Sequence, residues 1–192
     1  MNSPVRDVVV VPSTLALLPE YAGQEDPVAD LRAACRVAVA WLVERNPSHV
    51  DIVSAPARED NEARGVTRPA SVAIARHLLV EADFHGSIGA LPSAGALVVA
   101  NGSAMRTEKA PGHLDERAFA FDDALGRALA EGDAAGLRAV DEGLGDELWC
   151  HDVPACHVMG ELVTEPVTSV HVDYADDPYG VQYWVVRWSC AS

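Results

Sequence analysis

The feature of this sequence that most constrains its fold is an uninterrupted run of four valines near the amino terminus, Val8–Val11. Valine is β-branched and favours strands, and four in succession place apolar side chains on both faces of one strand. Such a strand must be covered on both sides, as in the centre of a mostly parallel sheet with helices on each face. Pro12 and Ser13 end the run, so we predict a buried strand over residues 6–12.

Apolar periodicity predicts the elements that follow. Apolar side chains recur every three or four residues over 26–45 and again over 72–82, which indicates two amphipathic helices. Short apolar runs at His49–Ser54 and at 94–100 are typical of further buried strands. The charged, aperiodic stretch 56–66 predicts a solvated loop. Strand, helix, strand, helix, strand is the order of a doubly wound α/β sheet.

The second half of the chain predicts three more helices. Asp115 is a favoured N-cap residue, and the apolar stripe after it runs to Gly132, a residue that commonly ends helices. A shorter helix is expected over 134–140. The third helix is expected over 154–162, because Pro154 is tolerated in a first turn.

A hairpin is predicted at the carboxyl terminus. Val170, Val172 and Tyr174 alternate with His171 and Asp173, which indicates a strand with one apolar face. A turn with the sequence DDPYG follows, and the returning strand is expected over 181–189. We therefore predict that residues 1–192 form a single α/β domain. It should be a three-layer sandwich with a central, mostly parallel sheet, flanking helices and a C-terminal β-hairpin.

The charge balance restricts the partners of the chain. It carries 29 acidic and 14 basic residues, a formal net charge of −15, so it would repel nucleic acids and anionic membranes at long range. No apolar run approaches the roughly 18 residues of a membrane span, and the opening segment is too short for a secretory signal. We expect a cytoplasmic protein that binds neither nucleic acid nor membranes.

Three stretches together resemble one protein family. They are the opening VVVVPSTLALLPE, the central NGSAMRTEKAPGHLDERAFAFDDALGRALAEGD and the closing DYADDPYGVQYWVVRW. These stretches resemble the actinobacterial proteins similar to the catalytic subunit of class III extradiol ring-cleavage dioxygenases, a superfamily that includes the Memo-like proteins. The resemblance covers most of the chain in the same order, with a shortened segment near 56–68. It implies the same α/β fold.

The resemblance also implies where a metal site should lie. Active members hold a non-haem Fe(II) with two histidines and a carboxylate, and a further histidine acts as acid and base. The first ligand follows the first strand, where this chain has Ser13 and Thr14. The second belongs to the loop after the second strand, where only acidic residues are available. These are Glu59, Asp60 and Glu62.

The remaining two positions of the family pattern are also altered. Ala104 and Met105 follow Ser103 where the acid/base histidine is expected, and neither can carry a proton. Asp152 corresponds to the carboxylate ligand. One ligand of three cannot hold ferrous iron, so the resemblance implies a pseudoenzyme without ring cleavage, and we expect no cofactor.

Our leading hypothesis is that the chain retains a pocket at the carboxyl ends of its strands, where open α/β sheets bind ligands. The pocket would bind a small molecule or a partner protein. Arg106 and Lys109 could meet an anionic group there, or they could pair with nearby carboxylates and fix the loop. The predicted pocket residues are Ser13, Asn101, Ser103, Arg106, Lys109 and His113.

A second hypothesis is a metal-dependent enzyme, of dioxygenase or hydrolase type, with a rebuilt zinc or iron site. The segment CHDVPACH supplies five ligand-type side chains, namely Cys150, His151, Asp152, Cys156 and His157. Their spacing matches no standard zinc pattern, and the alternative is that they are ordinary residues at a helix entry.

Three further interpretations complete the predictions. Cys150 and Cys156 could form a disulfide, and Cys156 near a helix N-terminus could be a reactive thiolate, but reduced, buried thiols are the commoner state. Ser13 and Ser103 lack a G-x-S-x-G motif that would indicate serine hydrolysis. Because active members of the family often oligomerise, the chain could also be a component of a homo-oligomer.

Overall fold

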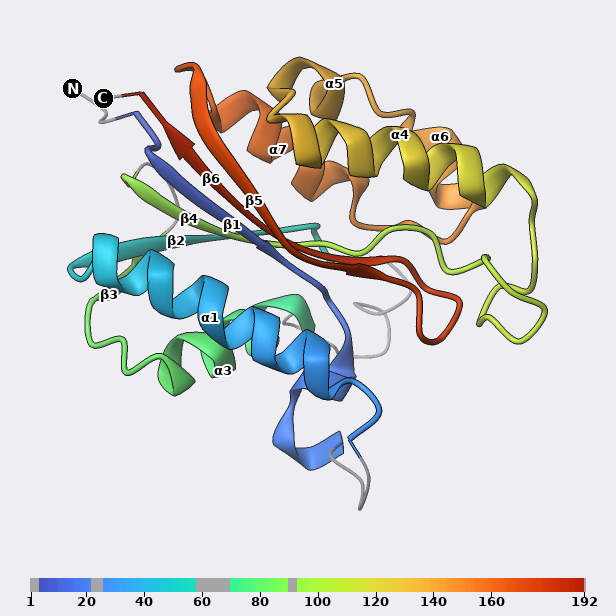
Figure 1. Cartoon of the computed structure of the whole chain (residues 1–192), viewed down its shortest axis with the longest axis horizontal. Coiled ribbons are helices and arrows are strands. Elements are labelled where there is room, and N and C mark those ends of the chain that lie inside the picture. The colour runs from blue at the N-terminus through green and yellow to red at the C-terminus, as the bar shows by residue number, and fades with distance from the viewer. Residues whose placement is uncertain (1–3, 22–25, 58–69, 90–92, 192) are drawn as a thin grey trace.

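The computed structural model describes residues 4–21, 26–57, 70–89 and 93–191. The described strands all belong to one six-stranded sheet, and helices cover both of its faces (Figure 1). This arrangement confirms the predicted three-layer α/β class with a mostly parallel sheet and a C-terminal hairpin. None of the helices in these ranges combines the length and the apolar character that a membrane crossing requires.

The sheet has the strand order β3-β2-β4-β1-β6-β5. Neighbours among the first four are parallel, whereas β6 runs antiparallel to both β1 and β5. The strands are β1 (Asp7–Val11), β2 (His49–Ser54), β3 (Ser87–Gly89), β4 (Gly95–Val99), β5 (Val167–Asp176) and β6 (Tyr183–Cys190).

Helices α1 and α3 cover one face of the sheet, and α4, α5, α6 and α7 form the layer on the other face (Figure 1). Two short 3-10 helices, η1 (Leu15–Leu17) and η2 (Pro19–Tyr21), follow β1. The α-helices are α1 (Ala29–Arg45), α3 (Ala70–Glu81), α4 (Arg117–Glu131), α5 (Ala134–Arg138), α6 (Glu142–Glu147) and α7 (Val153–Leu162).

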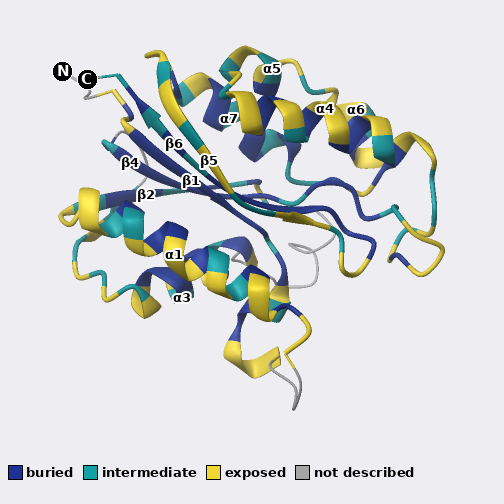
Figure 2. Cartoon of the chain, viewed as in Figure 1, coloured by how far each residue is buried: buried dark blue, intermediate teal, exposed yellow. Residues whose placement is uncertain are grey.

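The valines of β1 are shared between the two cores, as their uninterrupted run predicts. Val8 and Val10 pack under α4 and α7, while Val9 and Val11 pack against α1 and α3. All four are at most 2% exposed. Figure 2 shows the same burial along the central strands. Burying both faces removes a large apolar area from water, at about 25 cal/mol per Å².

The structure corrects the predicted pattern of β5. Val170 packs on the core under α4 and α7, but Tyr174 packs on the core under α1, so the two side chains do not share one face. The register shifts between Val172 and Tyr174, where Asp173 is an extra residue opposite β6. Such a bulge places successive side chains on the same face, and here it turns Asp173 toward Arg187, 2.7 Å away.

Other differences concern short elements and helix ends. Neither β3 nor α6 was predicted, because three and six residues are too few for a periodic signal. Glu116, not Asp115, occupies the N-cap position of α4, although a carboxylate oxygen of Asp115 accepts a hydrogen bond from the Arg117 amide. Most of the predicted loop at 56–66 lies outside the described residues.

Candidate functional site

The carboxyl ends of β1 and β4 meet at one edge of the sheet, and four residues there form what we call the strand-end cluster: Ser13, Asn101, Cys150 and Asp152. The Ser13 hydroxyl donates to Oδ2 of Asp152 at 2.6 Å, and the Asn101 amide donates to the same oxygen at 3.0 Å. The Ser13 amide donates to Oδ1 of Asn101 at 2.8 Å. The cluster therefore joins the loops after β1 and β4 to the start of α7.

Asp152 occupies the N-cap position of α7 but makes no side-chain capping bond to its own helix. Its carboxylate instead reaches across to Ser13 and Asn101. Burial raises the pKa of Asp152, and the hydrogen bonds from these two partners act in the opposite direction. The thiol of Cys150 donates to the carbonyl oxygen of Asn101 at 3.3 Å. The polar groups of the cluster thus satisfy one another.

A second network surrounds Asp122, a carboxylate of α4 whose side chain is 1% exposed. It accepts hydrogen bonds from the amide and hydroxyl of Ser103, at 2.8 and 2.6 Å, and from Nη1 of Arg106 at 3.2 Å. Arg106 also donates to Asp177 at 2.5 Å. Burial raises the pKa of Asp122, while the donors from Ser103 and Arg106 favour its ionised form.

Gly102 lets the loop after β4 pass close to this network. Its amide donates to the Gln182 carbonyl at 2.8 Å, and the Gln182 amide donates to the Ser103 carbonyl at 2.9 Å. A Cβ atom on Gly102 would lie 2.7 Å from Asp122, Gln182 and Trp184. Because these contacts are too short for a side chain, only glycine fits at this position.

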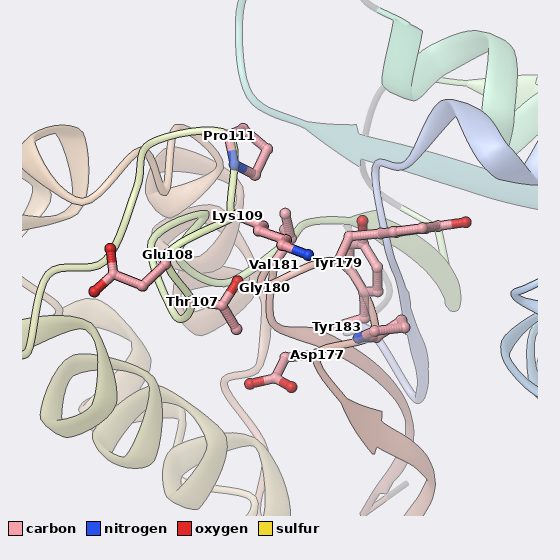
Figure 3. A pocket seen from close by; sticks show the side chains of 10 residues that line it. Thr107, Glu108, Lys109, Pro111, Asp177, Tyr179, Gly180, Val181 and Tyr183 are labelled. Atoms are coloured by element: carbon pink, nitrogen blue, oxygen red, sulfur yellow. The ribbon is translucent and has the colours of Figure 1, made fainter.

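A cleft of about 800 Å³ opens beside the Asp122 network, between the loop after β4 and the turn that joins β5 to β6. Lys109 and Tyr179 line opposite sides, and Tyr183 forms part of the wall. Figure 3 shows Lys109 directed toward the two tyrosines and Glu108 directed away from them. The other lining residues are Thr107, Pro111, Asp177, Pro178, Gly180 and Val181.

The six predicted pocket residues divide among these features. Ser13 and Asn101 belong to the strand-end cluster, and Ser103 and Arg106 belong to the Asp122 network. Of the six, Lys109 lines the cleft. His113 is exposed and has a left-handed backbone conformation, with φ of 62°. Arg106 pairs with two local carboxylates, which is the alternative that the sequence left open.

The two histidines of the predicted metal cluster contact different partners. His151 contacts Asp146 at 3.0 Å, whereas Nε2 of His157 lies 2.9 Å from the carbonyl oxygen of Val140. Among the residues that the structure describes, no three His, Cys, Asp or Glu side chains converge in a way that could hold a metal ion. The rebuilt metal centre therefore gains no support from this segment, because His151 and His157 are directed toward different partners.

The four cysteines are free and buried. Cys150 and Cys156 are therefore not joined, and the alternative of a disulfide between them is wrong. Burial raises the pKa of the Cys156 thiol to about 12, which disfavours the alternative of a reactive thiolate at this residue. Loss of hydration at a buried thiol outweighs the benefit of a helix N-terminus.

The acidic residues Glu59, Asp60 and Glu62 lie outside the described residues. The other positions implied by the dioxygenase resemblance can be located. Ser13 and Asp152 are in contact, and Ala104 is buried. One carboxylate and one neutral hydroxyl do not fit ferrous iron, which requires imidazole ligands in such a site.

No family model matches the chain, and a search of curated proteins finds no match.

The sequence analysis did not predict Asp122 or the two tyrosines of the cleft. A signal for Asp122 was present, because it follows Ala118 by four residues and precedes Leu125 by three on the buried stripe of α4. A carboxylate on an apolar stripe needs partners when it is buried.

Proposed function

We propose that this chain is a ligand-binding, dioxygenase-like protein without ring-cleaving activity, and that its cleft binds a small aromatic carboxylate. The hydrogen bond from Ser13 to Asp152 is the observation that carries the first part of this proposal. In the family that the sequence resembles, these positions supply iron ligands. Here Oδ2 of Asp152 already accepts two hydrogen bonds, and the Ser13 hydroxyl is a weak ligand for ferrous iron.

Proton transfer fails at this site for a similar reason. Ala104 occupies the position of the acid/base histidine and is 8% exposed, and Met105 packs against the core. Neither side chain can accept a proton from a catechol hydroxyl. A ring-cleaving reaction would therefore lack both its metal ligands and its base.

The cleft supplies the second part of the proposal. Its volume falls within the roughly 300–1,000 Å³ typical of small-molecule sites. Lys109 is the only lysine in the chain, and no described residue forms an ion pair with it. Asp177 on the opposite wall pairs with Arg106, which also pairs with Asp122. A carboxylate at Lys109 would therefore meet a free positive charge in an otherwise acidic protein.

The tyrosines and prolines of the cleft favour a ligand whose carboxylate is attached to a flat, partly apolar group. Tyr183 is 3% exposed and Tyr179 is 41% exposed, so the wall runs from a buried ring to an accessible ring. Aromatic rings pack against each other in offset or edge-to-face geometry, at about 0.5–1.5 kcal/mol per pair. Benzoate is the simplest compound with both features.

Titration calorimetry with benzoate tests this proposal, with neutral benzamide as the matched ligand. We expect benzoate to bind and benzamide to bind at least about tenfold more weakly, equivalent to about 1.4 kcal/mol. Lys109→Gln should reduce benzoate binding by a similar factor. Arg127→Gln, which removes one positive charge from an exposed position on α4, is the charge-matched control and should bind like the parent protein.

Two results would overturn the proposal. If benzoate does not bind at millimolar concentration, or if Lys109→Gln leaves its binding unchanged, the proposed ligand is wrong. If the protein consumes oxygen with catechol and added ferrous iron faster than a protein-free control, the proposal that it lacks ring-cleaving activity is wrong.

A further inference from the structure

Three polar side chains form a hydrogen-bonded row where β2 and β3 begin. These strand starts lie at the opposite end of the sheet from the loop after β4 and the turn that joins β5 to β6 (Figure 1). Nδ1 of His49 lies 2.6 Å from the Ser87 hydroxyl, and Nε2 of His49 lies 3.0 Å from Oδ1 of Asp51. The row therefore has the order serine, imidazole, carboxylate. This is the arrangement that activates a serine for nucleophilic attack.

The register of the two strands explains why the row forms. His49 pairs with Ser87, and Asp51 pairs with Gly89, in a parallel ladder. Alternate residues of a strand share a face, so all four of these positions point to the same side of the sheet. Gly89 leaves the space that the imidazole occupies, since a Cβ atom there would lie 2.6 Å from Cε1 and Nε2 of His49.

Burial increases in order along the row. Ser87 is exposed, the His49 side chain is 40% exposed, and the Asp51 side chain is fully buried. Oδ2 of Asp51 is the only buried side-chain nitrogen or oxygen, within the described ranges, that has no hydrogen-bond partner. Among the described residues, the hydrogen-bond partner of this carboxylate is the His49 imidazole, and a buried carboxylate in that position orients the ring. An accessible nucleophile, a half-buried base and a buried orienting group match the requirements of acyl transfer.

The backbone beside Ser87 offers a donor for the developing oxyanion. The Ser87 amide donates to the Ser48 carbonyl at 2.9 Å, so the next amide along β3, that of Ile88, points away from β2. Because β3 is the outermost strand, this amide has no ladder partner among the described residues. The amide that follows the nucleophile serves as an oxyanion donor in other serine hydrolases.

We propose that Ser87, His49 and Asp51 form a second, catalytic site that hydrolyses short-chain carboxylic esters. Oγ of Ser87 attacks the ester carbonyl carbon as its proton passes to Nδ1 of His49. The bond to the leaving alcohol breaks, and His49 returns the proton to that alcohol. Water then attacks the acyl-serine with His49 again as base, which releases the carboxylic acid and restores Ser87. No other reactant is required.

Two features distinguish this row from the usual hydrolase triad. The serine meets Nδ1 and the aspartate meets Nε2, which exchanges the two ring nitrogens but preserves one acceptor and one donor in the plane of the ring. The Ser87 hydroxyl also lies 3.2 Å from the Ser48 carbonyl. When His49 is protonated, the hydroxyl can accept from Nδ1 and donate to that carbonyl.

The full-length protein with p-nitrophenyl acetate and an alkyl fluorophosphonate tests the proposal. We expect hydrolysis of the ester, and we expect the fluorophosphonate to label Ser87, identified by mass spectrometry of its peptide. Ser87→Ala should remove the label and lower hydrolysis at least about tenfold. Ser169→Ala, an exposed serine of β5, is the matched control and should retain both activities.

A further variant separates catalysis from folding. Gly89→Ala keeps Ser87, His49 and Asp51 in the sequence but displaces the His49 ring, so it should slow labelling of Ser87 while the circular dichroism spectrum remains native. Absence of labelling in the parent protein would overturn the proposal. So would hydrolysis that survives Ser87→Ala but disappears in His49→Gln, because the imidazole would then act without the serine.

Discussion

Replacement of Ser103 by alanine tests whether the Asp122 network holds the loop after β4. Ser103 is fully buried, and its hydroxyl lies 2.6 Å from an oxygen of Asp122. Hydrogen bonds to charged groups contribute about 1.5–3 kcal/mol. The Ser103 amide and Arg106 still reach Asp122 in the variant, so we expect a loss of roughly 2 kcal/mol. For a chain of this length, that loss lowers the Tm by about 4–8 °C.

The loss should depend on pH. Burial raises the pKa of Asp122 above its ordinary value of 3.8. A folded pKa above the unfolded one means that the contribution of this carboxyl to stability decreases as pH rises through the window between the two values. The Ser103 hydroxyl favours the ionised form. Its removal raises the folded pKa further, so Ser103→Ala should lose more stability near pH 8 than below pH 3.8, where this carboxyl is protonated in both the folded and the unfolded state.

Urea unfolding followed by tryptophan fluorescence measures this effect at several pH values, since Trp184 and Trp188 are buried. Ser169→Ala, at an exposed position, is the control and should change the free energy of unfolding by less than about 0.5 kcal/mol. A loss for Ser103→Ala as small as that of the control would refute the reasoning. A loss that is the same at every pH would refute the assigned role of Asp122.

Three further predictions concern the strand-end cluster, a helix end and the thiols. Asp152→Ala leaves the Ser13 hydroxyl and the Asn101 amide without an acceptor, and should lower the free energy of unfolding measured in urea by about 2–3 kcal/mol. An unchanged free energy of unfolding would contradict these two hydrogen bonds. Gly132→Ala should lower the free energy of unfolding by about 1 kcal/mol or more, because Gly132 has a φ of 72° and a Cβ would lie 2.9 Å from Val167. An unchanged Tm would contradict that backbone conformation. Ellman's reagent should detect less than one thiol in the folded protein and four in guanidinium, since every cysteine is buried; rapid reaction of a folded thiol would contradict this burial.

Periodicity within the sequence was sufficient to predict most of the fold. The valines of β1 and the apolar stripe of α1 indicate which side chains are buried away from water, and this pattern of burial predicts the layers of an α/β sandwich. Ser13 and Asn101 follow predicted strands, so their meeting at one edge of the sheet was also predictable. These conclusions depend on residues that are close in sequence, or on the shared direction of parallel strands.

Other contacts were decided only by the tertiary structure. Ser87 and His49 are 38 residues apart, and Ser13 and Asp152 are 139 residues apart. A local pattern of apolar residues predicts that a residue is buried, but it does not predict which residue lies opposite it on a neighbouring strand. That partner depends on register, on the bulge at Asp173 and on glycines such as Gly89 that leave room for a side chain. Packing of distant segments therefore determined the polar networks, whereas the sequence alone determined the layers that carry them.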